Sequence, residues 1–134
     1  MREIIRNKVI LARHIKKEDL KPGLNFFSHD EEFIQVGIWG HYEKGKELAA
    51  HVHKKFDRKA DRTYEVLFVL SGSLKATIYD FENNVIEKIE VQQGEILVLL
   101  ECGHGYEITS DDTTVLEIKN GPYSGAEKDR YRIP

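Results

Sequence analysis

The central part of the chain consists of short segments in which apolar and polar residues alternate. Alternation with a period of two is typical of β-strands with one buried face, whereas an amphipathic helix repeats its apolar residues every three or four positions. Residues 73–81 (SLKATIYDF) and 85–91 (VIEKIEV) follow this pattern. Residues 65–70 (EVLFVL) are apolar from the second position onward, which favours a strand covered on both faces.

Turn signals separate these segments at intervals of about ten residues, as in sandwiches and barrels. Ser71-Gly72 and Asn83-Asn84 are two of them. Helix evidence is confined to residues 14–20 (HIKKEDL), which stop before Pro22-Gly23. Further strands are predicted in segments 32–39, 94–100 and 113–119. The sequence therefore predicts an all-β domain with a short N-terminal irregular or helical segment.

Size and charge narrow the class of protein. With 134 residues the chain has room for one domain, residues 1–134, with a barrel core at about 33–119. A net charge of −3 argues against binding to nucleic acid. The apolar block near the N-terminus, Val9–Ala12, is too short for a secretory or membrane-spanning segment. Cys102 is the one cysteine and cannot form an internal disulfide, so we expect a cytoplasmic protein that binds no membrane.

Two histidines point to a metal site. His51 and His53 are two positions apart, so on a strand their imidazoles would project from the same face and could hold one metal ion. A ten-residue loop (54–63) precedes Glu65, whose carboxylate would return to the imidazoles if the loop closes a hairpin. His104 could supply a third nitrogen. Three nitrogens and one oxygen would leave positions open for a substrate.

These residues resemble the first sequence motif of the cupin family. Gly45, five residues, His51-x-His53, then Glu65, six residues and Gly72 follow the order of that motif. The resemblance implies a double-stranded β-helix, the cupin jelly-roll barrel, and a homodimer. It also implies a divalent transition metal, which could be iron, manganese, nickel, zinc or copper.

Residues 94–108 (GEILVLLECGHGYEI) resemble the second cupin motif. Leu100 replaces the motif's proline, Cys102 stands at its glycine, and His104 comes one position early. The C-terminal flank, residues 117–134, is similar to that of small uncharacterised cupins, some associated with surface-polysaccharide or nucleotide-sugar biosynthesis. We interpret the charged tail within it as an exposed or subunit-crossing segment.

Two further features bear on the chemistry. Tyr106 lies two residues beyond His104, so a regular strand would place both on one face, where Tyr106 could act as a general acid and Glu65 as a base. The loop at 54–62 (KKFDRKADR) carries an excess of positive charge. Its cations could select an anionic, sugar-like substrate. The candidate substrate-binding residues are Arg58, Lys59 and Arg62.

Three functions remain open from sequence. The first is a metal-dependent cupin enzyme that isomerises, epimerises or oxygenates a small carbohydrate-like molecule. The second, implied by the resemblance, is a metal-free nucleotide-sugar epimerase or keto-isomerase with His51 or His53 as base and Tyr106 as acid. The third is a non-enzymatic binding or sensing module. The sequence leaves the substrate, the metal and the reaction undetermined.

Overall fold

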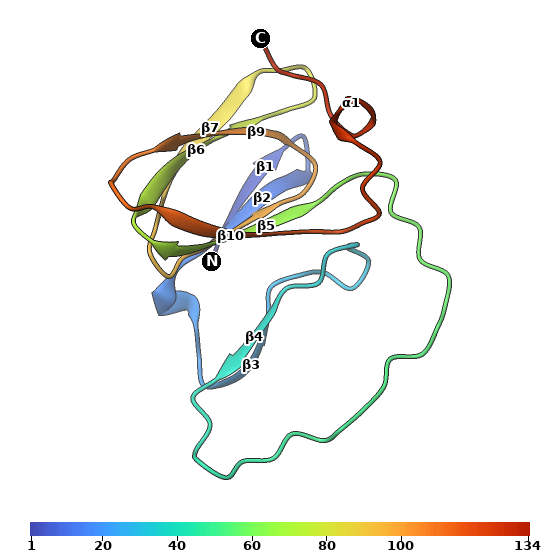
Figure 1. The fold of residues 1–134 in the computed structure, drawn as a ribbon, viewed down its shortest axis with the longest axis vertical. Helices are drawn as coiled ribbons and strands as arrows, with labels where there is room; N and C mark the ends of the chain where they lie inside the picture. The colour runs from blue at the N-terminus through green and yellow to red at the C-terminus, as the bar shows by residue number, and fades with distance from the viewer.

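The computed structural model describes residues 1–134 as an almost entirely antiparallel β protein (Figure 1). Its strands are β1 (Arg2–Arg6), β2 (Val9–Ile15), β3 (Gly23–Phe26), β4 (Gly37–Gly40), β5 (Glu65–Ser71), β6 (Ser73–Tyr79), β7 (Val85–Gln92), β8 (Ile96–Leu99), β9 (Gly103–Ile108) and β10 (Thr114–Lys119). The helical elements are the 3-10 turn η1 (Lys17–Asp19) and the single turn α1 (Ala126–Asp129). Neither has the length or apolar character needed to cross a bilayer.

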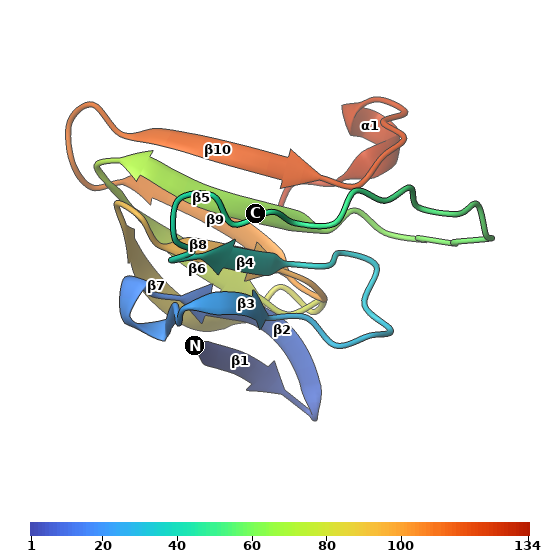
Figure 2. The same cartoon turned by 90° about the horizontal axis from the view of Figure 1, so that it is seen from below.

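The strands form three layers. A five-stranded sheet has the order β1-β2-β8-β5-β10, and a three-stranded sheet has the order β7-β6-β9. The hairpin β3-β4 is a separate two-stranded sheet. In Figure 1 the three-stranded sheet lies above the large sheet and the hairpin lies below it, and Figure 2 shows the hairpin across the lower face. The fold class predicted from sequence is thus confirmed at the level of antiparallel all-β structure.

The main core fills the space between the two larger sheets. Strand β6 directs Leu74, Ala76 and Ile78 into it, as their alternation predicts, and all three are buried. Strand β5 contributes Leu67 to this core, while its neighbour Val66 packs in a second apolar cluster on the opposite face. The prediction that β5 is covered on both faces is therefore confirmed.

The second cluster holds the covering layer on the large sheet. Its buried members are Ile15, Phe27, Tyr64, Val66, Val98 and Leu100. Of the predicted strand 32–39, only residues 37–39 fall within a strand, β4, while Ile34 and Val36 pack against the cluster from an irregular segment. The burial that the alternation predicts is largely kept, although most of the segment makes no ladder.

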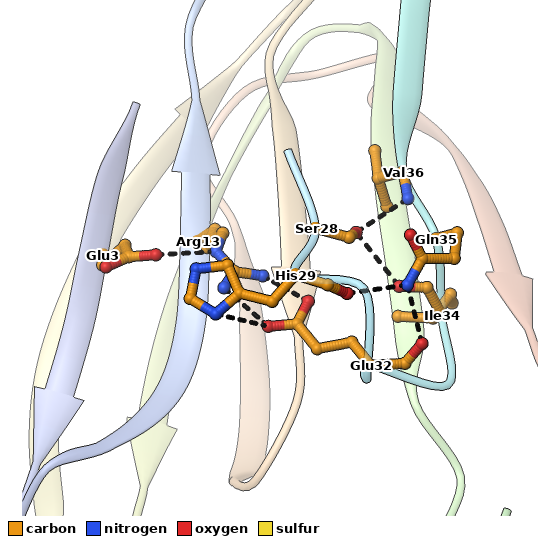
Figure 3. Close-up of polar contacts among 8 residues, drawn as sticks. All are labelled: Glu3, Arg13, Ser28, His29, Glu32, Ile34, Gln35 and Val36. Carbon is orange, nitrogen blue, oxygen red and sulfur yellow. Dashed lines mark hydrogen bonds and ion pairs between the residues drawn. The ribbon is translucent and has the colours of Figure 1, made fainter. Parts of the chain in front are cut away.

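One buried arginine fastens this covering segment to the sheet (Figure 3). The guanidinium of Arg13 on β2 donates to Glu3 on β1 at 2.9 Å and forms two 2.6 Å hydrogen bonds with Glu32. The segment is folded on itself by Ser28, whose hydroxyl donates to the Ile34 carbonyl at 3.0 Å. Arg13 has no exposed surface.

The N-terminus departs from the prediction. In place of an irregular or helical segment, residues 2–15 form the β1-β2 hairpin, and only η1 is helical. Asn7 and Lys8 connect the strands with φ values of 50° and 67°. Two consecutive residues at positive φ are the signature of the tight hairpin turn that matches strand twist. The Asn-Lys pair between two apolar runs was the signal for it.

Two other strand predictions need correction. The alternation of residues 85–91 predicts that Val85 shares the core face with Ile89 and Val91, yet Val85 is 54% exposed because the β6-β7 register shifts between Ile78 and Tyr79. The strand expected over His51 and His53 does not form, since residues 41–64 contain no regular structure. Figure 1 shows this connection as a wide arc on one side of the sheets. No closed barrel is formed by these elements.

Candidate functional site

The carboxylate of Glu65 is the centre of the candidate site. Glu65 begins β5 and points to the same face as Leu67, toward the space between the sheets. Its Oε1 lies 2.8 Å from Nζ of Lys119, and its Oε2 lies 3.1 Å from Nε2 of His104. The hydroxyl of Tyr106 donates to the same Oε2 at 3.4 Å. One buried carboxylate thus meets an ammonium, an imidazole and a phenol.

Strand β9 positions the imidazole and the phenol. His104 and Tyr106 are two residues apart on it and pair with Ile78 and Ala76 of β6, so both face the interior, as their spacing predicts. The register is regular along β9, without a bulge at Gly103 or Gly105. The two rings stack with centroids 5.2 Å apart. Nδ1 of His104 is buried and has no hydrogen-bond partner.

Lys119 belongs to the site but was not singled out from the sequence. It ends β10 directly opposite Glu65 in the β10-β5 ladder. It also lies 3.3 Å from Glu117, its neighbour on the same face of β10. The signal was a cation inside a predicted strand, and its meaning depends on which strand pairs with which.

The environment fixes the protonation states of the acidic groups. Burial raises the pKa of Glu65, but hydrogen bonds from His104 and Lys119 lower it by more, so the pKa falls to about 2 and the group is an anion near neutral pH. Burial raises the pKa of Tyr106, and the negative charge of Glu65 raises it further. Burial likewise raises the pKa of Cys102 to about 12. The site therefore combines a carboxylate with a protonated phenol, and the nearby thiol is inert.

These groups line a cavity of about 640 Å³. Small-molecule sites typically have volumes of ~300–1,000 Å³. Arg62, predicted to bind substrate, lines the cavity, with its guanidinium 4.1 Å from the ring centre of Phe81 and its Nε 3.3 Å from Glu101. Arg58 and Lys59 do not line it, and Arg58 instead lies over the ring of Phe56 within the exposed connection. Only one of the three predicted cations is therefore at the cavity.

The two histidines of the first motif lie elsewhere. His51 and His53 are both exposed on the 41–64 connection, with ring centroids 5.0 Å apart. Nδ1 of His51 lies 3.0 Å from the Ala49 carbonyl. They stay outside the cavity because the strand that was predicted to carry them does not form, and both edges of β5, its predicted hairpin partner, are occupied by β8 and β10.

The proposed metal ligands therefore fit an ion only in part. Glu65 and His104 lie together, and the unpartnered Nδ1 of His104 is a free donor atom. No group of three or more histidine, cysteine or carboxylate side chains is arranged to hold a metal ion. In this arrangement the four predicted ligands do not make a site, and metal binding stays a prediction.

Comparison with protein-family models, curated proteins and solved structures found no match for the chain. The function is therefore inferred from the chemistry of the side chains. The strongest constraint is the cluster of Glu65, His104, Tyr106 and Lys119 on the cavity wall.

Proposed function

We propose that the cavity binds a small, polar, carbohydrate-like anion and that its side chains catalyse a proton transfer, giving isomerisation or epimerisation. The observation that carries this proposal is that Glu65 contacts both His104 and Tyr106, at 3.1 Å and 3.4 Å, on the wall of one cavity. Such reactions need a base that removes a proton beside a carbonyl and an acid that protonates its oxygen.

His104 is the proposed base. Its Nε2 faces the Glu65 carboxylate, so the hydrogen belongs on Nε2 and Nδ1 is the free acceptor. Nδ1 is buried in this arrangement, so substrate binding must first displace the atoms that cover it. When Nδ1 then takes a proton from a substrate carbon, the ring becomes a cation, and the adjacent carboxylate stabilises it. Glu65 is thus a positioning residue, and Lys119 holds its second oxygen in place.

Tyr106 is the proposed acid. Because its pKa is raised, it keeps its proton until the substrate oxygen becomes strongly basic, as in an enolate. Donation from Tyr106 to that oxygen would give a neutral enediol and leave a phenolate. Return of the proton from His104 to a neighbouring carbon, or to the other face, together with transfer of an enediol hydroxyl proton back to Tyr106, would complete the reaction. Both side chains then regain their starting protonation states, and no oxidant or reductant is needed.

A metal-dependent enzyme is the second candidate. It is favoured by the unpartnered Nδ1 of His104 and by the two adjacent imidazoles of His51 and His53 on the connection that leads into Glu65. The 41–64 connection would have to lie against the free edge of β9, which would also complete a cupin jelly roll. A bound divalent ion would polarise a substrate oxygen.

A homodimer is part of the same proposal. The hairpin β3-β4 exposes Phe26 and Trp39, and the edge strand β10 exposes Leu116 and Ile118. Large apolar side chains gathered at a sheet edge and on a hairpin are typical of surfaces that another chain covers. Light scattering after gel filtration would give the mass of a dimer, and a monomer at all concentrations would contradict it.

The experiment is a proton-exchange measurement in D₂O on a panel of sugar phosphates, with metal content measured on the same samples. Under the first proposal, His104→Ala abolishes exchange and Tyr106→Phe slows it, whereas the double variant His51→Ala/His53→Ala keeps it. Under the second, the parent holds about one metal per chain, as one catalytic metal site per chain requires, and the double variant loses both metal and exchange. His41→Ala removes an exposed histidine outside the cavity and is the control. Binding without exchange would favour a non-enzymatic module.

A further inference from the structure

The C-terminal tail forms one side of the cavity. After β10 the chain turns back, and five consecutive residues, Asp129–Ile133, line the cavity beside β9. Figure 1 shows α1 and the C-terminus on the side of the three-stranded sheet, beyond the end of β10. A segment that sequence analysis treats as exposed or subunit-crossing is therefore part of the candidate site.

Specific contacts hold the tail in this position. The hydroxyl of Thr63 donates to Asp129 at 2.5 Å, and that of Tyr131 donates to Asn83 in the β6-β7 turn at 3.4 Å. Ile133 packs on Gly103, where an added Cβ would lie 2.7 Å from the Ile133 Cδ1. The tail thus passes within contact distance of the residue that precedes His104.

Most charged groups around the cavity already have partners. Lys119 is paired with Glu65 and Glu117, and Arg62 is paired with Glu101. Asp80 accepts hydrogen bonds within its own turn, from the amide nitrogens of residues 82 and 84 and the side chain of residue 84.

Arg130 and Arg132 are different. Both line the cavity, and neither guanidinium forms an ion pair or a side-chain hydrogen bond. Each offers five N–H donors in a planar fork that matches the oxygens of a phosphate or carboxylate. The rest of the lining carries four carboxylates, Glu65, Asp80, Glu117 and Asp129, against the two cations Arg62 and Lys119. The two unpaired guanidinium groups balance this excess and are the cations of the lining that are free to meet an anion.

We infer that Arg130 and Arg132 bind the phosphoryl group of the substrate and so select phosphorylated over neutral sugars. Two forks can together meet a dianionic phosphoryl group, whose three terminal oxygens accept more hydrogen bonds than one carboxylate does. The inference rests on the proposed function for the identity of the cavity. It moves anion selection from the loop at 54–62 to the tail.

The test is a binding titration by calorimetry with inorganic phosphate, glucose 1-phosphate and glucose as the probes. The proteins are the full-length parent, Arg130→Ala, Arg132→Ala, the double variant, and Lys128→Ala. Lys128 is the matched control because it removes the same charge from the same tail without lining the cavity. All three substituted residues are exposed, so the variants should have the same melting temperature as the parent.

Losing charge-assisted hydrogen bonds should weaken glucose 1-phosphate binding about 10- to 100-fold in the double variant, and each single variant should lose part of that. The affinity for inorganic phosphate should fall in parallel, while the affinity for glucose should not change. The Lys128→Ala protein should bind all three probes as the parent does. The inference is overturned if the double variant binds glucose 1-phosphate like the parent, or if the parent binds it no better than glucose. Failure of the proton-transfer proposal would be seen separately, because these titrations involve no turnover and the variants keep Glu65, His104 and Tyr106.

Discussion

Removal of Glu32 should destabilise the protein more than removal of the arginine that it binds. Arg13 has no exposed surface, whereas the side chains of Glu3 and Glu32 are 28% and 16% exposed. Glu32→Ala takes away two 2.6 Å hydrogen bonds and leaves a buried guanidinium with Glu3 alone. Breaking a buried pair in this way costs about 3–5 kcal/mol.

The value expected for Glu32→Ala is about 3 kcal/mol, at the lower end of that range, because one carboxylate remains and water can enter the vacated space. Arg13→Met should cost less, about 1–2 kcal/mol, since methionine keeps the apolar stem and the two freed carboxylates already reach solvent. The order of the two variants is therefore opposite to that of the hydrogen bonds they lose, three for Arg13 and two for Glu32.

Urea unfolding at neutral pH, followed by circular dichroism, measures both values, and equal slopes would show that the unfolded states are comparable. The control is Glu87→Ala, which breaks the Arg2–Glu87 pair at 2.7 Å between side chains that are 58% and 33% exposed. An exposed pair of this kind contributes less than about 1 kcal/mol. The reasoning is refuted if Glu32→Ala costs no more than Glu87→Ala, or if Arg13→Met costs more than Glu32→Ala.

The remaining predictions concern pH and the tail. The pKa of Glu65 is lowered to about 2 from 4.5, so the contribution of its ionised form to the free energy of unfolding is complete above pH 4.5 and is lost as the pH falls toward 2. In a plot of stability against pH, Glu65→Gln should therefore reduce the loss of stability on the acid side. Burial and a hydrogen bond to Glu101 raise the pKa of Tyr64 to about 12 from 10.0. The contribution of the protonated phenol to the free energy of unfolding is therefore complete below pH 10 and lost as the pH approaches 12. Phenolate absorbance should therefore show late titration of both Tyr64 and Tyr106, and Tyr64→Phe should remove the part that appears near pH 12. Gly103→Ala should push Ile133 off β9 and weaken glucose 1-phosphate binding with little change in urea stability; unchanged affinity would show that the tail's position is unimportant.

The all-β class could be read from sequence because its signal is local. Alternation along β6 assigns a face to each side chain without reference to any other strand, and Leu74, Ala76 and Ile78 are buried as predicted. Val85 escaped prediction because a register shift depends on the partner strand. The Asn7-Lys8 pair is present in the sequence, but a tight hairpin turn requires positive φ at both residues, and residue type alone does not give that conformation.

The same distinction between local spacing and long-range strand pairing separates the site residues that could be predicted from those that could not. His104 and Tyr106 share a face because they are two apart on one strand. Lys119 meets Glu65 only because β10 pairs with β5. The two strands are far apart in the sequence, so no local pattern indicates this contact. The predicted approach of His51 and His53 needed a further strand pairing, and the alanines before them and the charged run after them favour a strand only weakly.

Tyr64 and Glu65 are consecutive, yet their side chains lie on opposite sides of the large sheet, one bonded to Glu101 at 2.7 Å and the other in the cavity. A shift of one position exchanges the two faces of a strand. Under the metal-free proposal, short insertions or deletions within residues 41–61, none of which lines the cavity, should consequently leave proton exchange intact. A single residue added between Tyr64 and Glu65 would put them two positions apart and therefore on the same face, so that either the phenol would turn toward the cavity or the carboxylate would turn toward the second apolar cluster. Natural length variation should therefore stop at that boundary.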